Sequence, residues 1–179
     1  NYIVAHTAAR KITEIYMLPF SVFGTTMATF CGQNLGAGKN ERIKKGLWQV
    51  IWITWAWCAG MIILAYTVAP VLVHLITDTT QVKVIDTASL YLRMNTILYF
   101  IPAVICILRN AMQGIGDSIT PVISSSLELL CKVLVAAFLT PYLGYWAIIW
   151  SEPISWVIMV IPLLIRIANN PVLKGNQTN

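Results

Sequence analysis

Residues 32–46 read GQNLGAGKNERIKKG and form a short polar and basic segment between two long apolar runs. Glycines at positions 32, 36 and 38 permit backbone angles that other residues resist, so the chain can leave one helix and enter another within a few residues. Four cations follow and one acid opposes them: Lys39, Arg42, Lys44 and Lys45 against Glu41. Because cytoplasmic loops of membrane proteins are enriched in Lys and Arg, the segment indicates a cytoplasmic connection between two membrane spans.

The composition is that of a membrane protein. Hydrophobic residues make up 58% of the chain and charged residues 11%. A soluble domain carries about 25% charged residues, so this chain could not cover its surface with polar groups, and the lipid bilayer is its expected solvent. The net charge of +5 is concentrated in the cluster at 39–45. A basic cluster between two apolar runs indicates anionic lipid headgroups as neighbours and argues against nucleic acid as a partner.

The sequence offers no common catalytic or metal-binding motif. It contains no GxxxxGK[ST], HExxH, GxSxG or CxxC pattern, so ATP hydrolysis and common hydrolytic chemistry have no visible site in it. The four cysteines are far apart and lie in or beside apolar stretches, which favours a packing role over a disulfide framework or a metal site. We therefore expect a protein that is not an enzyme and that uses no cofactor.

Five stretches reach the roughly 20 mostly apolar residues that a membrane helix needs. They cover about 12–35, 47–76, 90–112, 121–140 and 145–167, with a helical approach to the first from Tyr2. Turn-forming residues separate the later ones: Thr77–Thr80 with Asp86, then Gly114–Asp117, then Pro141–Gly144. Such short connections make sequential helices antiparallel neighbours. The predicted fold is an all-α polytopic membrane helix bundle of about five transmembrane helices, formed by residues 1–179 as one membrane-embedded unit.

The distribution of Lys and Arg gives this bundle an orientation. The 36–46 loop, the 114–117 turn and the C-terminal tail fall on one side and carry most of the cations. By the positive-inside rule that side is cytoplasmic, which predicts an outside N-terminus and an inside C-terminus. Five spans leave the ends on opposite faces, so we expect the chain to be a piece of a larger bundle.

Two charged residues in the fourth span are candidates for an ion or substrate site, because charge inside a membrane is costly and commonly functional. Glu128 and Lys132 stand four residues apart on one helix face, with serines at 124–126 one turn earlier. One interpretation is a polar patch facing a water-filled cavity, where Glu128 gains and loses a proton. The other, which we favour, is a self-neutralised pair that anchors the helix, because a nearby cation holds Glu128 ionised.

Glu152 in the fifth span is the third candidate for the ion or substrate site. Pro153 follows it and removes a backbone donor, which frees carbonyl groups one turn earlier. An acid beside free carbonyls could bind a cation or a proton, or it could be hydrogen-bonded within the bundle. Pro102, near the middle of the third span, is a candidate hinge, since prolines inside membrane helices kink them.

Small residues recur at every fourth position from Gly24 through Ala28 and Gly32 to Gly36. This spacing lets membrane helices approach closely, so it predicts a packing surface.

Three segments of the chain resemble the multidrug and toxic compound extrusion (MATE) family of secondary transporters, and together they extend the resemblance to nearly the whole chain. They are residues 32–46, residues 109–134 with the sequence RNAMQGIGDSITPVISSSLELLCKVL, and residues 144–156 with the sequence GYWAIIWSEPISW. The matching motif positions, which we interpret as structural, are Gly32, Gln33, Gly36, Ala37 and Gly38 in the first segment, and Gln113, Gly114, Gly116, Asp117, Thr120 and Pro121 in the second.

This resemblance implies twelve helices in two six-helix lobes with a central cavity between them. The chain looks like helices eight to twelve, the C-terminal lobe without its first helix; the N-terminal lobe is the alternative. The implied activity is antiport by alternating access, in which inward H⁺ or Na⁺ is coupled to export of cationic amphipathic drugs. The implied partners are the lipid bilayer, these small cations and the missing N-terminal lobe, in a multi-pass protein of the plasma membrane (the cytoplasmic membrane in bacteria).

The sequence departs from some family members at the ion site. They carry an acid in the middle of the helix that corresponds to the third span, where this chain has no Asp or Glu and Pro102 lies near that level. Coupling would then rest on Glu128, on Glu152 or on an acid in the missing lobe. A lipid-linked sugar flippase of the same superfamily and a membrane-embedded enzyme or noncatalytic subunit are the alternatives. An enzyme would place two catalytic groups at one depth, and a flippase would line its cavity with several cations.

Overall fold

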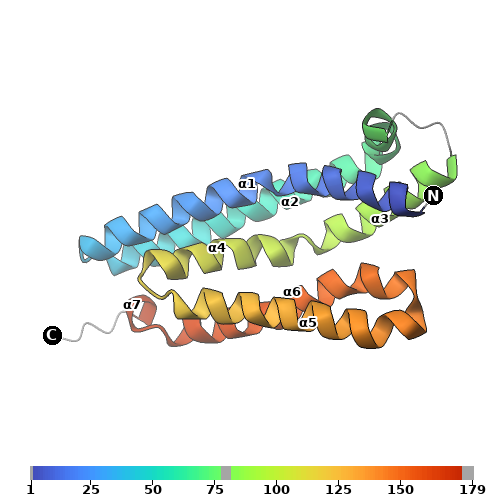
Figure 1. The fold of residues 1–179 in the computed structure, drawn as a ribbon. Coiled ribbons are helices and arrows are strands. Elements are labelled where there is room, and N and C mark those ends of the chain that lie inside the picture. Colours follow the sequence, from blue (N-terminus) through green and yellow to red (C-terminus); the bar gives the residue numbers. More distant parts are fainter. Residues whose placement is uncertain (1, 78–81, 175–179) are drawn as a thin grey trace.

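The structure is a computed structural model that describes residues 2–77 and 82–174. Within these residues the chain consists of helices joined by short turns and contains no strand, which confirms the predicted all-α fold (Figure 1). The helices are α1 (Tyr2–Gly36), α2 (Asn40–Thr77), α3 (Val82–Leu98), α4 (Phe100–Gly114), α5 (Ile119–Leu143), α6 (Tyr145–Asn169) and the single turn α7 (Pro171–Lys174).

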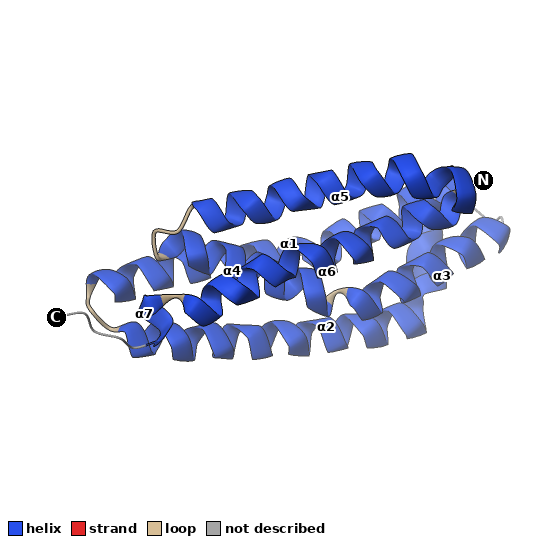
Figure 2. Ribbon diagram, turned by 90° about the horizontal axis from the view of Figure 1, so that it is seen from below, coloured by secondary structure: helices blue, strands red, loops and turns tan. Residues whose placement is uncertain are grey.

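The long helices run side by side along one axis and form two layers (Figures 1 and 2). The first layer contains α1, α2, α3 and α4, which pack against one another. The second is the antiparallel pair of α5 and α6, which packs on α4. One end of the bundle carries the α1–α2 turn, the α4–α5 turn and α7, and we call it the basic end; it lies to the left in Figure 1.

The helices agree with the predicted spans in number. Four are long and apolar enough to cross a membrane: Ala9–Gly36, Asn40–Leu75, Ile119–Leu139 and Trp150–Asn169. A fifth span consists of Ile85–Leu98 and Phe100–Gly114, two helices that meet at a bend of 50°. The membrane-crossing architecture is therefore confirmed, and the third span differs from the prediction because it is broken.

Two predicted turns have different boundaries in the structure. Asp86, expected between the second and third spans, lies inside α3, whereas most of the Thr77–Thr80 turn lies outside the described residues. In the segment Pro141–Gly144, residues 141–143 continue α5, and Gly144 with φ of +54° makes the turn. A positive φ is readily adopted by glycine, so a single residue reverses the chain there.

The break in the third span follows from Pro102. Proline has no backbone N–H, so it cannot donate to the carbonyl of Leu98, and its ring crowds that carbonyl. The helical pattern is interrupted at Tyr99, whose N–H donates to the Thr96 carbonyl at 3.2 Å. The Tyr99 carbonyl accepts the N–H of Ala103 at 3.1 Å, so the α-helix resumes immediately. The predicted kink is thus present as a bend between α3 and α4.

The predicted small-residue stripe on α1 faces α4 from Gly24 to Gly32, whereas Gly36 is exposed and does not belong to the packing surface. A Cβ atom added to Gly114 of α4 would come within 2.3 Å of the Ala28 carbonyl oxygen, and one added to Gly24 would meet the Asn110 side chain at 2.5 Å. A Cβ atom added to Gly32 would lie 3.3 Å from the Gly114 carbonyl oxygen. The stripe therefore sets how closely α1 and α4 approach, which fixes one wall of the cavity described next.

Candidate functional site

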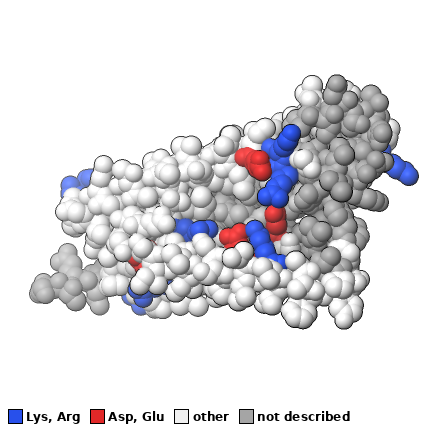
Figure 3. Space-filling model, in the orientation of Figure 1, with Lys and Arg blue, Asp and Glu red and all other residues white. Residues whose placement is uncertain are grey.

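A cavity of about 650 Å³ lies between the two layers of the bundle. Its walls come from α1, α3 and α4 on one side and from α5 and α6 on the other. Figure 3 shows charged side chains gathered on this face of the molecule, along the seam between the layers. We call it the charged cavity, because six residues with acidic or basic side chains of Glu, Lys or Arg line it: Arg10, Glu14, Arg109, Glu128, Lys132 and Glu152.

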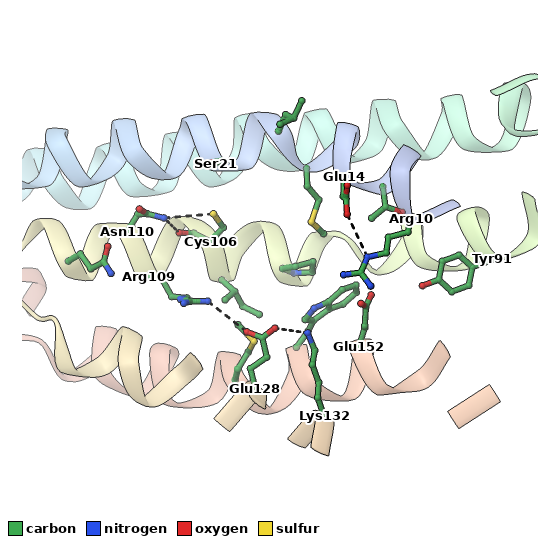
Figure 4. Close-up of a pocket in the computed structure, with 18 residues that line it drawn as sticks. Arg10, Glu14, Ser21, Tyr91, Cys106, Arg109, Asn110, Glu128, Lys132 and Glu152 are labelled. Atoms are coloured by element: carbon green, nitrogen blue, oxygen red, sulfur yellow. Dashed lines mark hydrogen bonds and ion pairs between the residues drawn. The ribbon is translucent and has the colours of Figure 1, made fainter. Parts of the chain in front are cut away.

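Glu128 is held by two cations from different helices. Its Oε1 accepts a hydrogen bond from Lys132 Nζ at 2.8 Å, and its Oε2 lies 3.9 Å from Arg109 Nη1 of α4. The Glu128 side chain is 26% exposed. This arrangement supports the interpretation of Glu128 as an anchor between α4 and α5 (Figure 4).

Arg109 extends that anchor to the serines of α5. Its Nη2 also donates to Ser125 Oγ, while the Ser125 hydroxyl donates to the Pro121 carbonyl at 2.9 Å. Arg109 thus contacts two successive turns of α5, and its removal would leave the Glu128 and Ser125 groups without their interhelical partner. Ser124, in the same run of serines, donates instead to the Met159 carbonyl of α6 at 3.1 Å.

Glu152 lies in a different electrostatic environment. Among the side chains that the structure describes, none forms a hydrogen bond or salt bridge with its carboxylate. In Figure 4 it points toward the guanidinium of Arg10 across the cavity, while Arg10 itself is paired with Glu14 at 3.6 Å. Glu152 thus lacks the close cation contacts that Glu128 makes with Arg109 and Lys132.

The two candidate acids stand at different depths. Counted along the helices from the basic end, Glu128 is about 14 Å into α5 and Glu152 about 26 Å into α6 at 1.5 Å per residue. Two catalytic groups of an enzyme would have to converge at one depth. The offset instead places acidic groups in succession along the cavity, as Figure 4 shows.

The structure brings together all the residues that the sequence suggested for the ion or substrate site and for the hinge. Glu128, Lys132, Glu152 and Pro102 line the same charged cavity. The sequence analysis did not select Arg10, Glu14 or Arg109 as candidates. A signal was present in α1, where positions 10, 14, 17 and 21 follow helical spacing and all line the cavity.

The family-motif residues lie at the basic end, away from the cavity, with the exception of Gln113. Gly38 has φ of +68° and Gly116 has φ of +89°, so each makes a turn that disfavours residues with a side chain. Gln113 lines the mouth of the charged cavity, and Gly114 packs against α1. Gln33 and Gly36 are exposed, and a Cβ at Gly36 would meet no atom within 4 Å.

Asp117 ties the α4–α5 turn to the end of α6. Its Oδ1 accepts the backbone N–H of Thr120 at 3.1 Å, so it caps α5, and its Oδ2 accepts Arg166 Nε at 2.9 Å. Burial opposes ionisation of this carboxyl, but the hydrogen bonds from Arg166 and Thr120 outweigh it and hold the pKa of Asp117 below its ordinary value. Pro121 sits in the first turn of α5, where its missing N–H breaks no hydrogen bond.

The fold and the cavity define a multi-pass membrane protein whose helices enclose a polar cavity. The family model described as MatE matches residues 1–138, and the chain belongs to this family. MatE proteins are membrane transporters rather than enzymes, within a superfamily that includes efflux proteins and flippases. No curated protein and no solved structure matches the chain. The matched range includes Glu128 and Lys132 and ends before Glu152.

Proposed function

We propose that this chain, residues 1–179, is the C-terminal lobe without its first helix of an ion-coupled antiporter that exports cationic amphipathic compounds. In this proposal the basic end and the C-terminus face the cytoplasm, and an N-terminal lobe completes the central pathway. The observation that carries the proposal is the charged cavity at membrane depth, with one carboxylate, Glu152, that lacks a partner among the described side chains.

The charges of the cavity supply a mechanism for exchange. Three cations and three acids line it, so the formal charges cancel when all are ionised. Protonation of one carboxylate, or binding of Na⁺ to it, leaves the cavity with one net positive charge. This positive charge repels a cationic compound, which the electrically neutral cavity could hold. The coupling ion and the exported cation therefore compete through charge, which is what antiport requires.

We assign the ion-binding role to Glu152 and a positioning role to Glu128. Glu128 already contacts two cations, Arg109 of α4 and Lys132 one turn further along α5, so its carboxylate is held between the two helices. Glu152 faces the cavity without such a contact, and Pro153 next to it frees a backbone carbonyl that could complete the coordination of a cation. Pro102 lines the same cavity, and we propose that the bend beside it changes between the outward-open and inward-open states.

Gradient-dependent efflux tests the proposed function. The full-length protein is reconstituted in liposomes, and export of a cationic dye is followed with an imposed H⁺ or Na⁺ gradient and without one. We expect transport only when a gradient of the coupling ion is present, and its abolition by an ionophore that dissipates that gradient. Dye movement equal to that of protein-free liposomes under both gradients would contradict antiport.

A lipid-linked sugar flippase is the second candidate. It is favoured by one observation, since Arg10 and Arg109 join Lys132 in the cavity, where the sequence had suggested a single cation. Three cations could hold a pyrophosphate group if the neighbouring acids were protonated or displaced. Translocation of a fluorescent lipid-linked sugar pyrophosphate in the same liposomes, with no dye export, would support this candidate over the first.

A further inference from the structure

A second hollow, of about 790 Å³, lies on the opposite side of α4 from the charged cavity. It runs between α2, α4 and α6 and is closed at the basic end by α7. Its walls are apolar except for two cations, Lys44 and Lys174, so we call it the lysine groove. Neither ammonium group lies within 4.0 Å of a carboxylate in the described part of the chain.

The length of the lysine groove matches one leaflet of a bilayer. On α2 its lining runs from Lys44 to Trp55, which at 1.5 Å per residue is about 16 Å. On α6 it runs from Ala168 back to Val157, about the same length. Half of the hydrocarbon core is about 15 Å. The edge-on rings of Trp55 and Phe100, 6.1 Å apart between centroids, stand at the inner limit of the groove.

The cations stand at the end where a lipid headgroup would lie. Lys44 comes from the first turns of α2, and α7 contributes Lys174, whose Nζ donates to Asn169 Oδ1 at 3.2 Å, to the same groove. Asn170 holds α7 in place, since its side-chain oxygen accepts the Val172 N–H at 3.0 Å and its carbonyl accepts the Lys174 N–H at 3.0 Å. Trp48, 56% exposed, lies one turn deeper than Lys44, at the level where indoles favour the membrane interface.

We propose that the lysine groove binds a phospholipid with an anionic headgroup. The phosphate lies between Lys44 and Lys174, and one acyl chain extends along α2, α4 and α6 toward Trp55. The apolar walls match the acyl chain, and the two uncompensated cations match the headgroup charge. The site is separate from the charged cavity and does not depend on the proposed transport activity.

Native mass spectrometry of the full-length protein tests this site. The protein is purified in detergent and incubated with equal amounts of phosphatidylglycerol and phosphatidylcholine, and the lipid retained on the folded protein is measured. We expect phosphatidylglycerol to be retained preferentially. The double substitution Lys44→Gln and Lys174→Gln should lower the ratio of retained phosphatidylglycerol to phosphatidylcholine about 5- to 30-fold, as two lost lysine–headgroup contacts imply.

Matched variants separate the groove from the general basic charge. The double substitution Lys39→Gln and Lys45→Gln removes two positive charges as well, but from residues that do not line the groove. It should leave the ratio of the two lipids unchanged. Ala168→Phe fills the groove without changing charge and should lower retention of the lipid, and it decides the question if the lysine variant does not fold. The proposal would be overturned if the two double lysine variants lowered the ratio equally. It would also be overturned if neither the Lys44→Gln, Lys174→Gln double variant nor Ala168→Phe lowered lipid retention.

Discussion

At the scale of single residues, charge pairing separates carboxylates that look alike in the sequence. Glu128 and Glu152 are both acids within apolar spans, but one contacts two cations and the other has no partner among the described side chains. Asp117 differs from both, since it lies outside the membrane spans, caps α5 and binds Arg166 near the end of α6. The sequence could predict the Glu128–Lys132 pair because both lie on one helix. Arg109 could not be predicted as a partner, because its contact depends on how α4 packs against α5.

The first prediction concerns Asp117. Asp117→Ala removes the cap and the ion pair and should lower the free energy of unfolding by about 1–2 kcal/mol. Asp117→Asn should cost less, because an amide oxygen still accepts the Thr120 N–H while the ion pair is lost. Thermal unfolding of the purified protein, followed by tryptophan fluorescence, measures both. An unaffected unfolding temperature in the Ala variant would contradict the assigned role.

The same residue gives a pH dependence with a definite sign. Because the pKa of Asp117 is lower in the folded protein than its ordinary value of 3.8, its ionised form stabilises the fold above that value. The stabilisation is lost as the pH falls through the lowered pKa. The difference in unfolding temperature between the unmodified protein and Asp117→Asn should therefore be constant at neutral pH and shrink below about pH 4. A difference in unfolding temperature that grows on acidification would contradict the lowered pKa of Asp117.

At the scale of helices, α4 is the element on which the two hollows depend. It carries the bend at Tyr99, it packs closely against α1 through Gly114, and it separates the charged cavity from the lysine groove. The sequence predicted the kink from Pro102 and the close packing from the small-residue spacing. It could not predict that the third span begins at Ile85, because the polar residues before Leu90 resemble a connection when their neighbours are unknown.

Gly114→Ala tests the close approach of α1 and α4. The added Cβ would meet the Ala28 backbone at 2.3 Å, so the helices must separate, and the free energy of unfolding should fall by about 1–3 kcal/mol. Gly36→Ala is the control, since its Cβ would meet nothing within 4 Å. Thermal unfolding of the two variants should differ accordingly. Equal stability would show that the helices accommodate the methyl group.

Pro102→Ala tests the bend as a moving part. Alanine restores a donor to the Leu98 carbonyl, so the 50° bend should decrease and the exchange between outward-open and inward-open states should slow. Distances between spin labels at Leu90 and Gln113 report the bend, and dye efflux reports turnover. Pro19→Ala, in α1, is the control and should leave both readouts unchanged. If Pro102→Ala kept both the bend and normal efflux, helix packing rather than Pro102 would cause the break, and the proposed moving role of Pro102 would be wrong.

At the scale of the whole molecule, two layers of helices leave a polar hollow on one side of α4 and an apolar hollow on the other. The charged cavity collects charged residues from α1, α4, α5 and α6 that are up to 142 positions apart in the sequence, from Arg10 to Glu152. Hydropathy and turn residues could predict the spans, since each is a local property. The grouping of three acids with three cations could not be predicted, because it depends on helix rotation and depth, which the helical period alone does not fix.

The most direct test of the account compares Glu152→Gln with Glu128→Gln in gradient-driven dye efflux by the full-length protein in liposomes. Glu152→Gln cannot bind a proton or Na⁺ as a carboxylate does, so gradient-dependent efflux should fall by about 5- to 150-fold, the usual size of a coupling between two ligands. Glu128→Gln should retain gradient dependence at matched protein levels, with lower stability because Arg109 and Lys132 lose their partner. Gradient-dependent efflux that survives Glu152→Gln and disappears with Glu128→Gln would contradict the account.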